Sequence, residues 1–185
     1  MNILSLFRQS FLIILSVFFT TSCKTEKGEL RLLLEEFEKT QIVLPSDMIM
    51  IKEGKICPSL KRDHKDMNTM VFYIGEGECS DCRISHLWDY SELFELSQET
   101  GTFEIMIIFS PIEEDISYVQ DRILSTQFSY PVYLDIHSLF SELNKLPDDI
   151  RFHTFLLDSD GYPILIGNPL NNKRIRTLFN HIIKF

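Results

Sequence analysis

The chain has few cysteines, few glycines and prolines, and fewer basic than acidic residues. Its four cysteines are too few for a scaffold built from disulfides in a chain of 185 residues. Seven glycines and seven prolines beside 44% hydrophobic residues exclude a fibrous or disordered chain and leave enough apolar material for one globular unit. The net charge of −9 argues against a nucleic-acid-binding protein, because such a protein needs a basic face to neutralise phosphates.

One apolar run, Phe11–Phe19, lies near the N-terminus, and only Ser16 interrupts it. A helix rises ~1.5 Å per residue, so this run spans about half of the ~30 Å hydrocarbon core of a bilayer. That length, after a start that carries only Arg8 and the terminal amine, is typical of the apolar region of a secretory signal peptide. We therefore expect the rest of the chain to be exported to the cell envelope, where disulfides can form.

The run is followed by Thr20-Thr21-Ser22-Cys23, in which small residues directly precede a cysteine. This resembles a bacterial lipoprotein signal, although Thr20 stands where leucine is usual. The resemblance implies that residues 1–22 are the signal peptide and that Cys23 becomes the lipidated first residue; ordinary signal cleavage nearby is the alternative. Because Arg8 is the only charged side chain before Cys23, the remainder is even more acidic than the whole chain. An anionic membrane surface would repel it, so we expect the lipid itself to be the anchor.

The remainder of the chain alternates between apolar runs of strand length and amphipathic helical patterns. We expect a helix over residues 29–41 and a small hairpin from residues 48–51 and 55–57, followed by a charged loop over 61–68. Further strands are predicted at 69–74, 103–109 and 131–134, helices at 80–100, 111–127, 138–146 and 173–183, and a hairpin from 154–157 and 164–166. Fully apolar strands alternating with helices predict an α/β fold with a central mixed sheet covered on both faces. Residues 69–185 would form this domain, and residues 23–68 a tether with an N-terminal helix and hairpin extension.

The segment Cys79-Ser80-Asp81-Cys82 lies between the end of an apolar strand and the start of a helix. Two residues between cysteines at a helix N-terminus bring both sulfurs onto one turn, within disulfide reach. The N–H groups and dipole of that terminus stabilise a thiolate, which is the species that attacks disulfides. We predict that Cys79 is the nucleophile and that Cys82 resolves the mixed disulfide. The alternative is a static structural bridge, although so small a loop gains least from cross-linking.

The order of elements carries a resemblance to a known family. Strand, CxxC, helix, strand, helix, an inserted element at Pro131–Asp135 and the hairpin sequence TFLLDSDG at Thr154–Gly161 resemble the thioredoxin fold in its TlpA/ResA-like branch. The resemblance covers about residues 69–185. It implies thiol–disulfide exchange with the thiols or disulfides of exported proteins, with Cys79 and Cys82 as the two active cysteines and without a soluble cofactor.

Two positions depart from that family's pattern. Glu78 stands where a tryptophan commonly precedes the first cysteine. The family usually places a cis-proline opposite the disulfide, just before the first strand of the last hairpin, whereas this position falls here at Phe152 or His153. A cis bond before a residue other than proline costs ~3 kcal/mol, so we expect a trans loop facing the site and a changed docking of the substrate.

The charges around the motif predict the direction of its redox chemistry. Glu76, Glu78 and Asp81 crowd the two cysteines, and in the sequence only Arg83 opposes them. Nearby anions disfavour a thiolate, which favours the disulfide and lowers its reduction potential. The sequence therefore predicts a reductant or a weak exchanger and argues against a strong oxidant.

Other interpretations stay open. The chain could be a non-catalytic lipoprotein of the same fold that docks to a partner assembly. It could also handle Cu(I) through Cys79, Cys82 and His153, as the Sco relatives of this fold do, although those proteins have three residues between their cysteines. A zinc site that begins with Cys79, Cys82 and His86 lacks a fourth ligand, so no metal ligand is assigned.

Two further patterns are set aside. A peroxidase of this fold needs a threonine three residues before its reactive cysteine, where this chain has Glu76 before Cys79. Cys57 could pair with another thiol, but a small hydrophobic side chain in the hairpin is the simpler interpretation of its position beside Ile56.

Overall fold

The computed structural model describes residues 27–58 and 67–184. The expected signal peptide, Cys23 and most of the expected charged loop at 61–68 lie outside these residues. The chain divides into two units, residues 1–39 and residues 40–185. In the first unit, residues 27–37 are helical, so this helix ends four residues before the predicted end at residue 41. In the part of the chain that the structure describes, we find no helix with the length and apolar character needed to cross a membrane.

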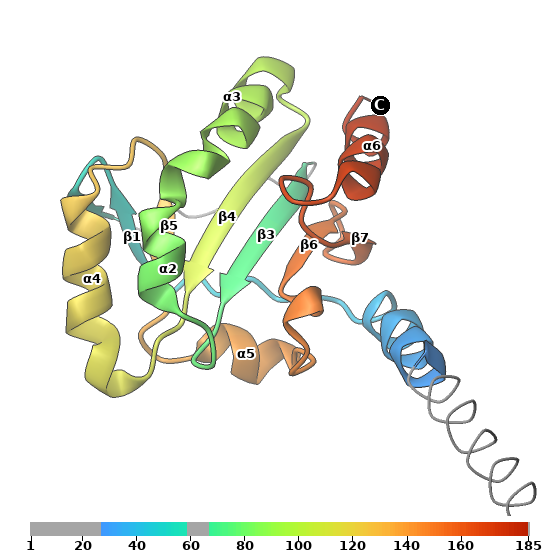
Figure 1. The fold of residues 1–185 in the computed structure, drawn as a ribbon, viewed down its shortest axis with the longest axis horizontal. Coiled ribbons are helices and arrows are strands. Elements are labelled where there is room, and N and C mark those ends of the chain that lie inside the picture. Colours follow the sequence, from blue (N-terminus) through green and yellow to red (C-terminus); the bar gives the residue numbers. More distant parts are fainter. Residues whose placement is uncertain (1–26, 59–66, 185) are drawn as a thin grey trace, which may run out of the picture. The chain divides into compact units, whose positions relative to one another are not determined.

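The second unit is built on a seven-stranded mixed sheet with the order β2-β1-β5-β4-β3-β6-β7 (Figure 1). Its strands are β1 (Ile49–Lys52), β2 (Lys55–Cys57), β3 (Asn68–Ile74), β4 (Phe103–Phe109), β5 (Val132–Leu134), β6 (Thr154–Leu157) and β7 (Pro163–Ile166). The pairs β3–β4 and β4–β5 are parallel, and all other neighbours are antiparallel. The predicted mixed sheet is therefore confirmed, and β1 joins the N-terminal hairpin to the sheet through β5.

Helices cover both faces of this sheet, and nearly every residue of β3 and β4 is therefore buried. One face packs against α2 (Ser80–Ser85), α3 (Ser91–Thr100), α4 (Ile116–Ser125) and α6 (Lys173–Ile182). On this face the rings of Phe103 and Phe179 meet edge to face at 5.1 Å. On the opposite face Tyr73 packs against Phe140 of α5 (Leu139–Asn144) at 5.1 Å.

The helix predicted over residues 80–100 is divided into three pieces, so the prediction of one continuous helix was wrong. α2 ends at Ser85, whose hydroxyl donates to the carbonyl of Asp81 (2.8 Å), a contact that competes with regular helix bonding. A single 3₁₀ turn, η1 (Leu87–Tyr90), then precedes α3. This break lets Leu87 and Tyr90 be buried under the sheet, with the ring of Tyr90 4.7 Å from that of Phe72.

Residues 40–48 form an extended segment that is hydrogen-bonded to the rest of the second unit at two places. The side-chain amide of Asn144 in α5 accepts the N–H of Val43 (2.6 Å) and donates to the carbonyls of Val43 (2.8 Å) and Phe140 (2.7 Å). The N–H of Ile42 donates to the carbonyl of Gly161 (2.8 Å) in the β6–β7 turn. Gly161 has φ +87°, and a Cβ there would lie 3.0 Å from the carbonyl oxygen of Ile42, so the turn requires glycine.

The substitution Asn144→Ala should destabilise the protein by about 3 kcal/mol, because Asn144 is 3% exposed and its side chain makes three hydrogen bonds to the backbone of Val43 and Phe140. Denaturant unfolding measures this loss. The neighbouring Leu143→Ala is the control, since Leu143 is 54% exposed and should change stability by less than about 0.5 kcal/mol. Equal stabilities for the two variants would contradict a stabilising role for the hydrogen bonds between Asn144 and Val43.

Candidate redox site

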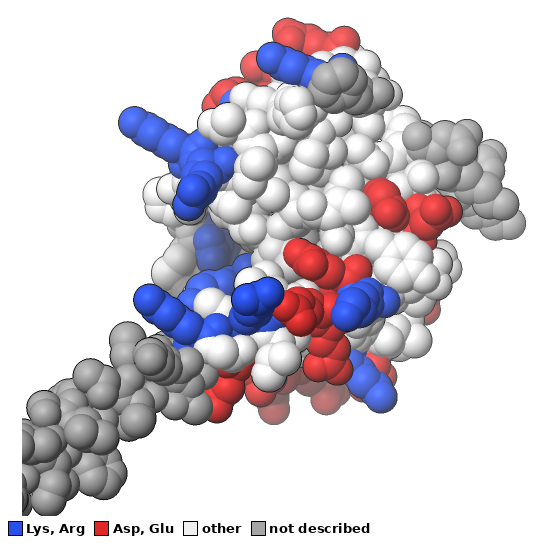
Figure 2. Space-filling view, turned by 90° about the vertical axis from the view of Figure 1, so that its right-hand side faces the viewer, with Lys and Arg blue, Asp and Glu red and all other residues white. Residues whose placement is uncertain are grey.

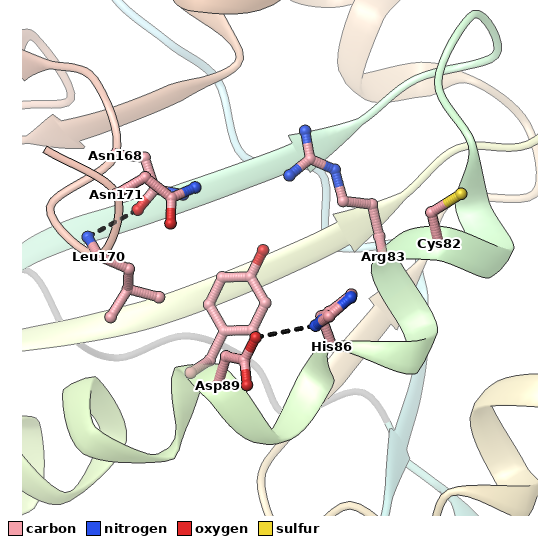
Figure 3. Close-up of a pocket in the computed structure, with 8 residues that line it drawn as sticks. Cys82, Arg83, His86, Asp89, Asn168, Leu170 and Asn171 are labelled. Carbon is pink, nitrogen blue, oxygen red and sulfur yellow. Dashed lines mark hydrogen bonds and ion pairs between the residues drawn. The ribbon is translucent and has the colours of Figure 1, made fainter.

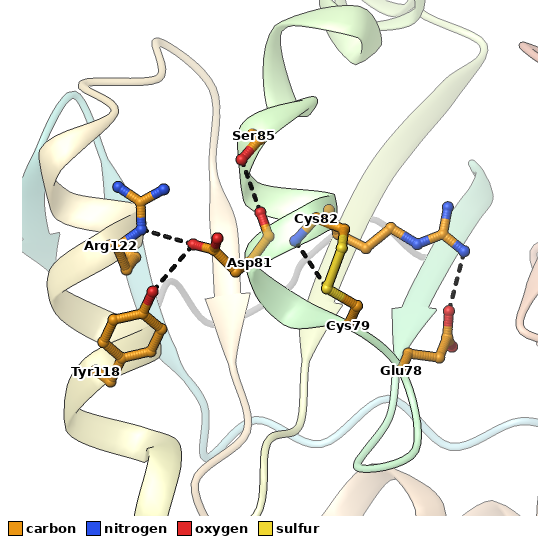
Figure 4. Close-up of a disulfide and its surroundings, with 8 residues drawn as sticks. Glu78, Cys79, Asp81, Cys82, Ser85, Tyr118 and Arg122 are labelled. Carbon is orange, nitrogen blue, oxygen red and sulfur yellow. Dashed lines mark hydrogen bonds and ion pairs between the residues drawn. A yellow bond between two sulfur atoms is a disulfide. The ribbon is translucent and has the colours of Figure 1, made fainter.

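Cys79 and Cys82 form a disulfide at the N-terminus of α2, beyond the carboxyl end of β3 (Figure 4). Cys79 caps the helix: its sulfur accepts the N–H of Cys82 at 3.2 Å. That bond is one of the contacts that would stabilise a thiolate at Cys79 after reduction. Both cysteines are exposed, so an incoming thiol can reach either one, and burial does not distinguish the attacking from the resolving cysteine.

Asp81 points from α2 toward α4, where two side chains hold it (Figure 4). Arg122 donates to its carboxylate at 2.7 Å, and the hydroxyl of Tyr118 donates to the same oxygen at 3.2 Å. The hydrogen bond from Arg122 is the main reason that the pKa of Asp81 lies below its ordinary value. Asp81 therefore remains ionised, but its charge is compensated by a cation from another helix.

Glu78 lies on the other side of the disulfide and is also compensated. Arg83 donates to one of its oxygens at 3.0 Å, and a ring nitrogen of His153 lies 2.8 Å from the other. Burial would raise the pKa of Glu78, but the hydrogen bonds from His153 and Arg83 outweigh it and hold the pKa below its ordinary value. The side chain of Glu78 is only 8% exposed, so this ion pair is largely shielded from water.

These contacts correct the prediction that only Arg83 opposes the acidic residues of the motif. Arg122 and His153 come from distant parts of the chain, and the sequence around the cysteines contains no sign of them. Glu76 accepts the hydroxyl of Ser138 at 3.2 Å. The site is therefore less negative than the sequence suggests, and repulsion between a thiolate and the carboxylates is correspondingly weaker.

Of the two loop residues singled out in the sequence, the structure brings His153 to the site. Phe152 is 1% exposed and lies in the interior. His153 follows the 3₁₀ turn η3 (Ile150–Phe152), and its two ring nitrogens contact the carboxylate of Glu78 and the carbonyl of Pro147 (3.1 Å). No described residue has a cis peptide bond, so the loop is trans, as expected. Since both partners of the ring are acceptors, the two contacts form together only when both nitrogens carry a proton.

These contacts bear on the metal-binding interpretations. Both nitrogens of His153 are engaged, so the Cu(I) ligand set of two cysteines and this histidine would first require the contact to Glu78 or the contact to the carbonyl of Pro147 to break. Nδ1 of His86 lies 3.0 Å from the carboxylate of Asp89. Among the residues described, no group of three or more His, Cys, Asp or Glu side chains has an arrangement that could hold a metal ion. Cys57 is a partly exposed free cysteine in the edge strand β2.

A pocket of about 390 Å³ adjoins the disulfide on the side of Cys82 (Figure 3). One wall comes from α2 and η1 through Arg83, His86, Asp89 and Tyr90; the other comes from the loop between β7 and α6 through Asn168, Leu170 and Asn171. Nothing in the sequence patterns predicted this second wall. Its asparagines precede the helix cap Asn172, so they indicate a loop, but nothing in the sequence shows that this loop faces the cysteines.

No protein-family model and no curated protein matches the sequence. A structure from Chlorobium tepidum, named as a thiol:disulfide interchange protein DsbE, matches with a TM-score of 0.52 and 12% identity over 78% of this chain and 98% of that chain. A thioredoxin-like protein from Porphyromonas gingivalis matches with a TM-score of 0.45 and 15% identity, covering 79% of this chain and 93% of the other. The thioredoxin domain of a thiol-disulfide oxidoreductase from Bacteroides vulgatus matches with a TM-score of 0.46 and 18% identity over 75% and 96%.

The chain thus has a thioredoxin-like fold, and its paired cysteines have the CxxC spacing at the start of a helix. This confirms the fold expected from the sequence.

The lowered pKa of Glu78 predicts a specific dependence of stability on pH. Since Glu78 is harder to protonate in the folded chain, its contribution to stability is present above its ordinary pKa of 4.5 and is lost as the pH falls through its lower folded value. Glu78→Gln should therefore be less stable than the unmodified chain at pH 6 and should lose less stability on acidification below pH 4.5. Unfolding by denaturant across this range is the measurement. Glu76→Gln is the control and should keep the original slope; parallel curves for the chain and Glu78→Gln would contradict the assignment.

Proposed function

We propose that the chain is a membrane-anchored thiol–disulfide exchange protein that acts on exported proteins through Cys79 and Cys82. The observation that carries the proposal is the exposed disulfide at the N-terminus of α2. Reduction would give a Cys79 thiol beside the N–H of Cys82 and the first turn of a helix, where a thiolate is favoured. That thiolate would attack a substrate disulfide, and Cys82 would then release the reduced substrate while the Cys79–Cys82 bond forms again.

The location proposed for this activity is the cell envelope. The signal-like segment before Cys23 and the lipoprotein resemblance support export followed by lipid anchoring at that cysteine. The acidic composition supports a role for the lipid in holding the chain at the membrane, because anionic headgroups would repel the domain. In the lower middle of the face drawn in Figure 2, acidic side chains lie between basic ones.

We propose a reductant or weak exchanger over a strong oxidant. α2 has only six residues and carries Asp81 in its first turn, which limits the help that the helix gives to a thiolate. The flanking carboxylates are paired and so contribute less than the sequence suggests, but they add no net positive charge that would favour a thiolate. A weakly stabilised thiolate corresponds to a stable disulfide and a low reduction potential.

The substitution Cys82→Ser tests the activity directly. Without the resolving thiol, the mixed disulfide at Cys79 should accumulate, and purification of the full chain from its host under thiol-blocking conditions should recover exported proteins bound covalently to it. Gel mobility with and without reductant, followed by mass spectrometry, identifies the adduct and the cysteine involved.

Two controls make the experiment decisive. Cys57→Ser in the Cys82→Ser background should leave the adducts unchanged, since Cys57 lies outside the pair. Cys79→Ser in the same background should abolish them. If no adduct forms at Cys79 and the unmodified chain does not reduce insulin in the presence of dithiothreitol, the exchange function is wrong and a non-catalytic docking role replaces it.

The pairing of Asp81 with Arg122 predicts opposite shifts of the reduction potential in two variants. Asp81→Asn leaves Arg122 without its carboxylate near the cysteines, which favours the thiolate and raises the potential; Arg122→Gln leaves Asp81 uncompensated and lowers it. Each shift should be on the order of 10 mV, because both side chains are partly in water.

A titration of the cysteine pair against glutathione or dithiothreitol buffers measures these potentials. Glu114→Gln changes an exposed acid on another segment and should leave the potential where it is. Shifts of the same sign in Asp81→Asn and Arg122→Gln would contradict the role given to this ion pair.

A further inference from the structure

The side chains that line the pocket beside Cys82 offer more hydrogen-bond donors than acceptors. Arg83 contributes a guanidinium, which has only donors; one of its nitrogens donates to Glu78 (3.0 Å), and its other N–H groups remain as further donors. The Oδ1 atom of Asn168 already accepts the N–H of Leu170 (2.8 Å), so this side chain offers its amide N–H groups to the pocket. Asn171 lines the same wall and has no hydrogen bond to any residue that the structure describes. Figure 3 shows Asn168 and Asn171 directed from the loop toward the opposite wall that carries Arg83 and His86.

The lining has few acceptors besides the side-chain oxygen of Asn171. Asp89 is the one carboxylate among the described lining residues, and its Oδ2 lies 3.0 Å from Nδ1 of His86. This contact leaves Nε2 of His86 for another partner. Burial raises the pKa of Tyr90, so its hydroxyl keeps the proton and can donate. The lining thus has more donors than acceptors, which favours a ligand that brings acceptors, and the N–H groups of Arg83 that Glu78 leaves are the charged donors among them.

The pocket also adjoins the disulfide with which a substrate would react. Cys82 lines it, and the sulfur of Cys82 is bonded to that of Cys79. A thiol that approaches this disulfide carries its neighbouring atoms along the same surface. The donors are thus placed to contact groups one or two residues from the reacting sulfur.

We propose that this pocket selects thiols and disulfides that carry a carboxylate close to the reacting sulfur, with Arg83, Asn168 and Asn171 as the groups that bind the carboxylate. This inference rests on the proposed exchange function and names its substrate class. The carboxylate belongs either to an acidic residue beside the cysteine of a peptide segment or to a small thiol compound, and the chemistry of recognition is the same for both.

Matched peptides test the proposal on the full chain. Blocked pentapeptides with a central cysteine carry glutamate directly before or directly after it, and each has a glutamine twin. The rate at which each peptide thiol reduces the Cys79–Cys82 disulfide is measured by acid quench and thiol alkylation. Each rate is divided by the rate of the same peptide with an uncharged small disulfide, which removes differences in thiol reactivity. At least one glutamate peptide should react about tenfold faster than its twin, the effect of one charge-assisted hydrogen bond.

Two isosteric variants locate the effect. Asn171→Asp places a negative charge in the pocket and should reduce the preference for glutamate to about one. Gln98→Glu makes the same change of charge at an exposed position of α3 outside the pocket lining and should keep the preference. Asn171 is itself exposed, so its replacement should not impair folding. A preference that Asn171→Asp and Gln98→Glu reduce equally would mean a general effect of net charge and would overturn the pocket assignment.

A binding measurement separates this inference from the exchange function. The same peptides with serine in place of cysteine cannot react, and NMR titration of the oxidised chain gives their dissociation constants. If no peptide reduces the disulfide, the exchange function fails, while tighter binding of a glutamate peptide still supports the pocket. Equal rates and equal affinities for all twins overturn the pocket even where exchange is fast. The dipeptides Cys-Glu and Cys-Gln identify the source: discrimination between them assigns a small thiol, and discrimination only between pentapeptides assigns a peptide segment.

Discussion

The parallel pairing of β3 with β4 is the constraint on which the site depends. Seven residue pairs join the two strands, from Asn68 opposite Phe103 to Ile74 opposite Phe109. Both strands are buried on their two faces, so a slip of the register by one residue would exchange side chains between the two faces and disturb the packing on both. The carboxyl end of β3 is therefore fixed, and the chain that leaves it reaches Cys79 after a short turn in which the N–H of Glu78 donates to the carbonyl of Gly75 (3.0 Å). The position of the disulfide follows from the sheet.

Charge pairing across the fold determines what surrounds that disulfide. Asp81 and Glu78 flank the cysteines, and each is turned away from them toward a cation (Figure 4). The partner of Asp81 is on α4, so the packing of α2 against α4 is coupled to the electrostatics of the site. Glu78 is far less exposed than Asp81, which makes its pairing with Arg83 and His153 the costlier one to lose. A thiol reacts best as an anion, and two carboxylates lie near this one. The fold pairs each carboxylate with an arginine, which weakens their repulsion of the thiolate.

Sequence patterns predicted the elements well where the signal was local. The apolar run of β4 appears at its expected bounds because burial on both faces leaves a continuous apolar sequence, and the final hairpin also lies close to its expected bounds. The prediction of one continuous helix over 80–100 was wrong. The hydrogen bond from Ser85 to Asp81 and the burial of Leu87 and Tyr90 accompany the break, and the burial depends on tertiary packing that the local sequence does not show. The pairing of CxxC with a helix start was visible in the sequence. The partners Arg122 and His153 were not, since they lie 41 and 75 residues away from the acids that they contact.

His153 shows how this chain fixes the loop opposite the cysteines without a proline. Its carbonyl accepts the N–H of Tyr73 (2.8 Å), which ties the loop to β3. Its ring meets that of Tyr73 edge to face at 5.2 Å, and its two nitrogens contact Glu78 and the carbonyl of Pro147. A proline here would fix φ but would supply neither of these nitrogen contacts, so of the two partners of Glu78 only Arg83 would be left. The histidine and the glutamate before Cys79 are therefore best understood as one unit: each departs from the pattern of the family that the sequence resembles, and each supplies the contact that the other needs.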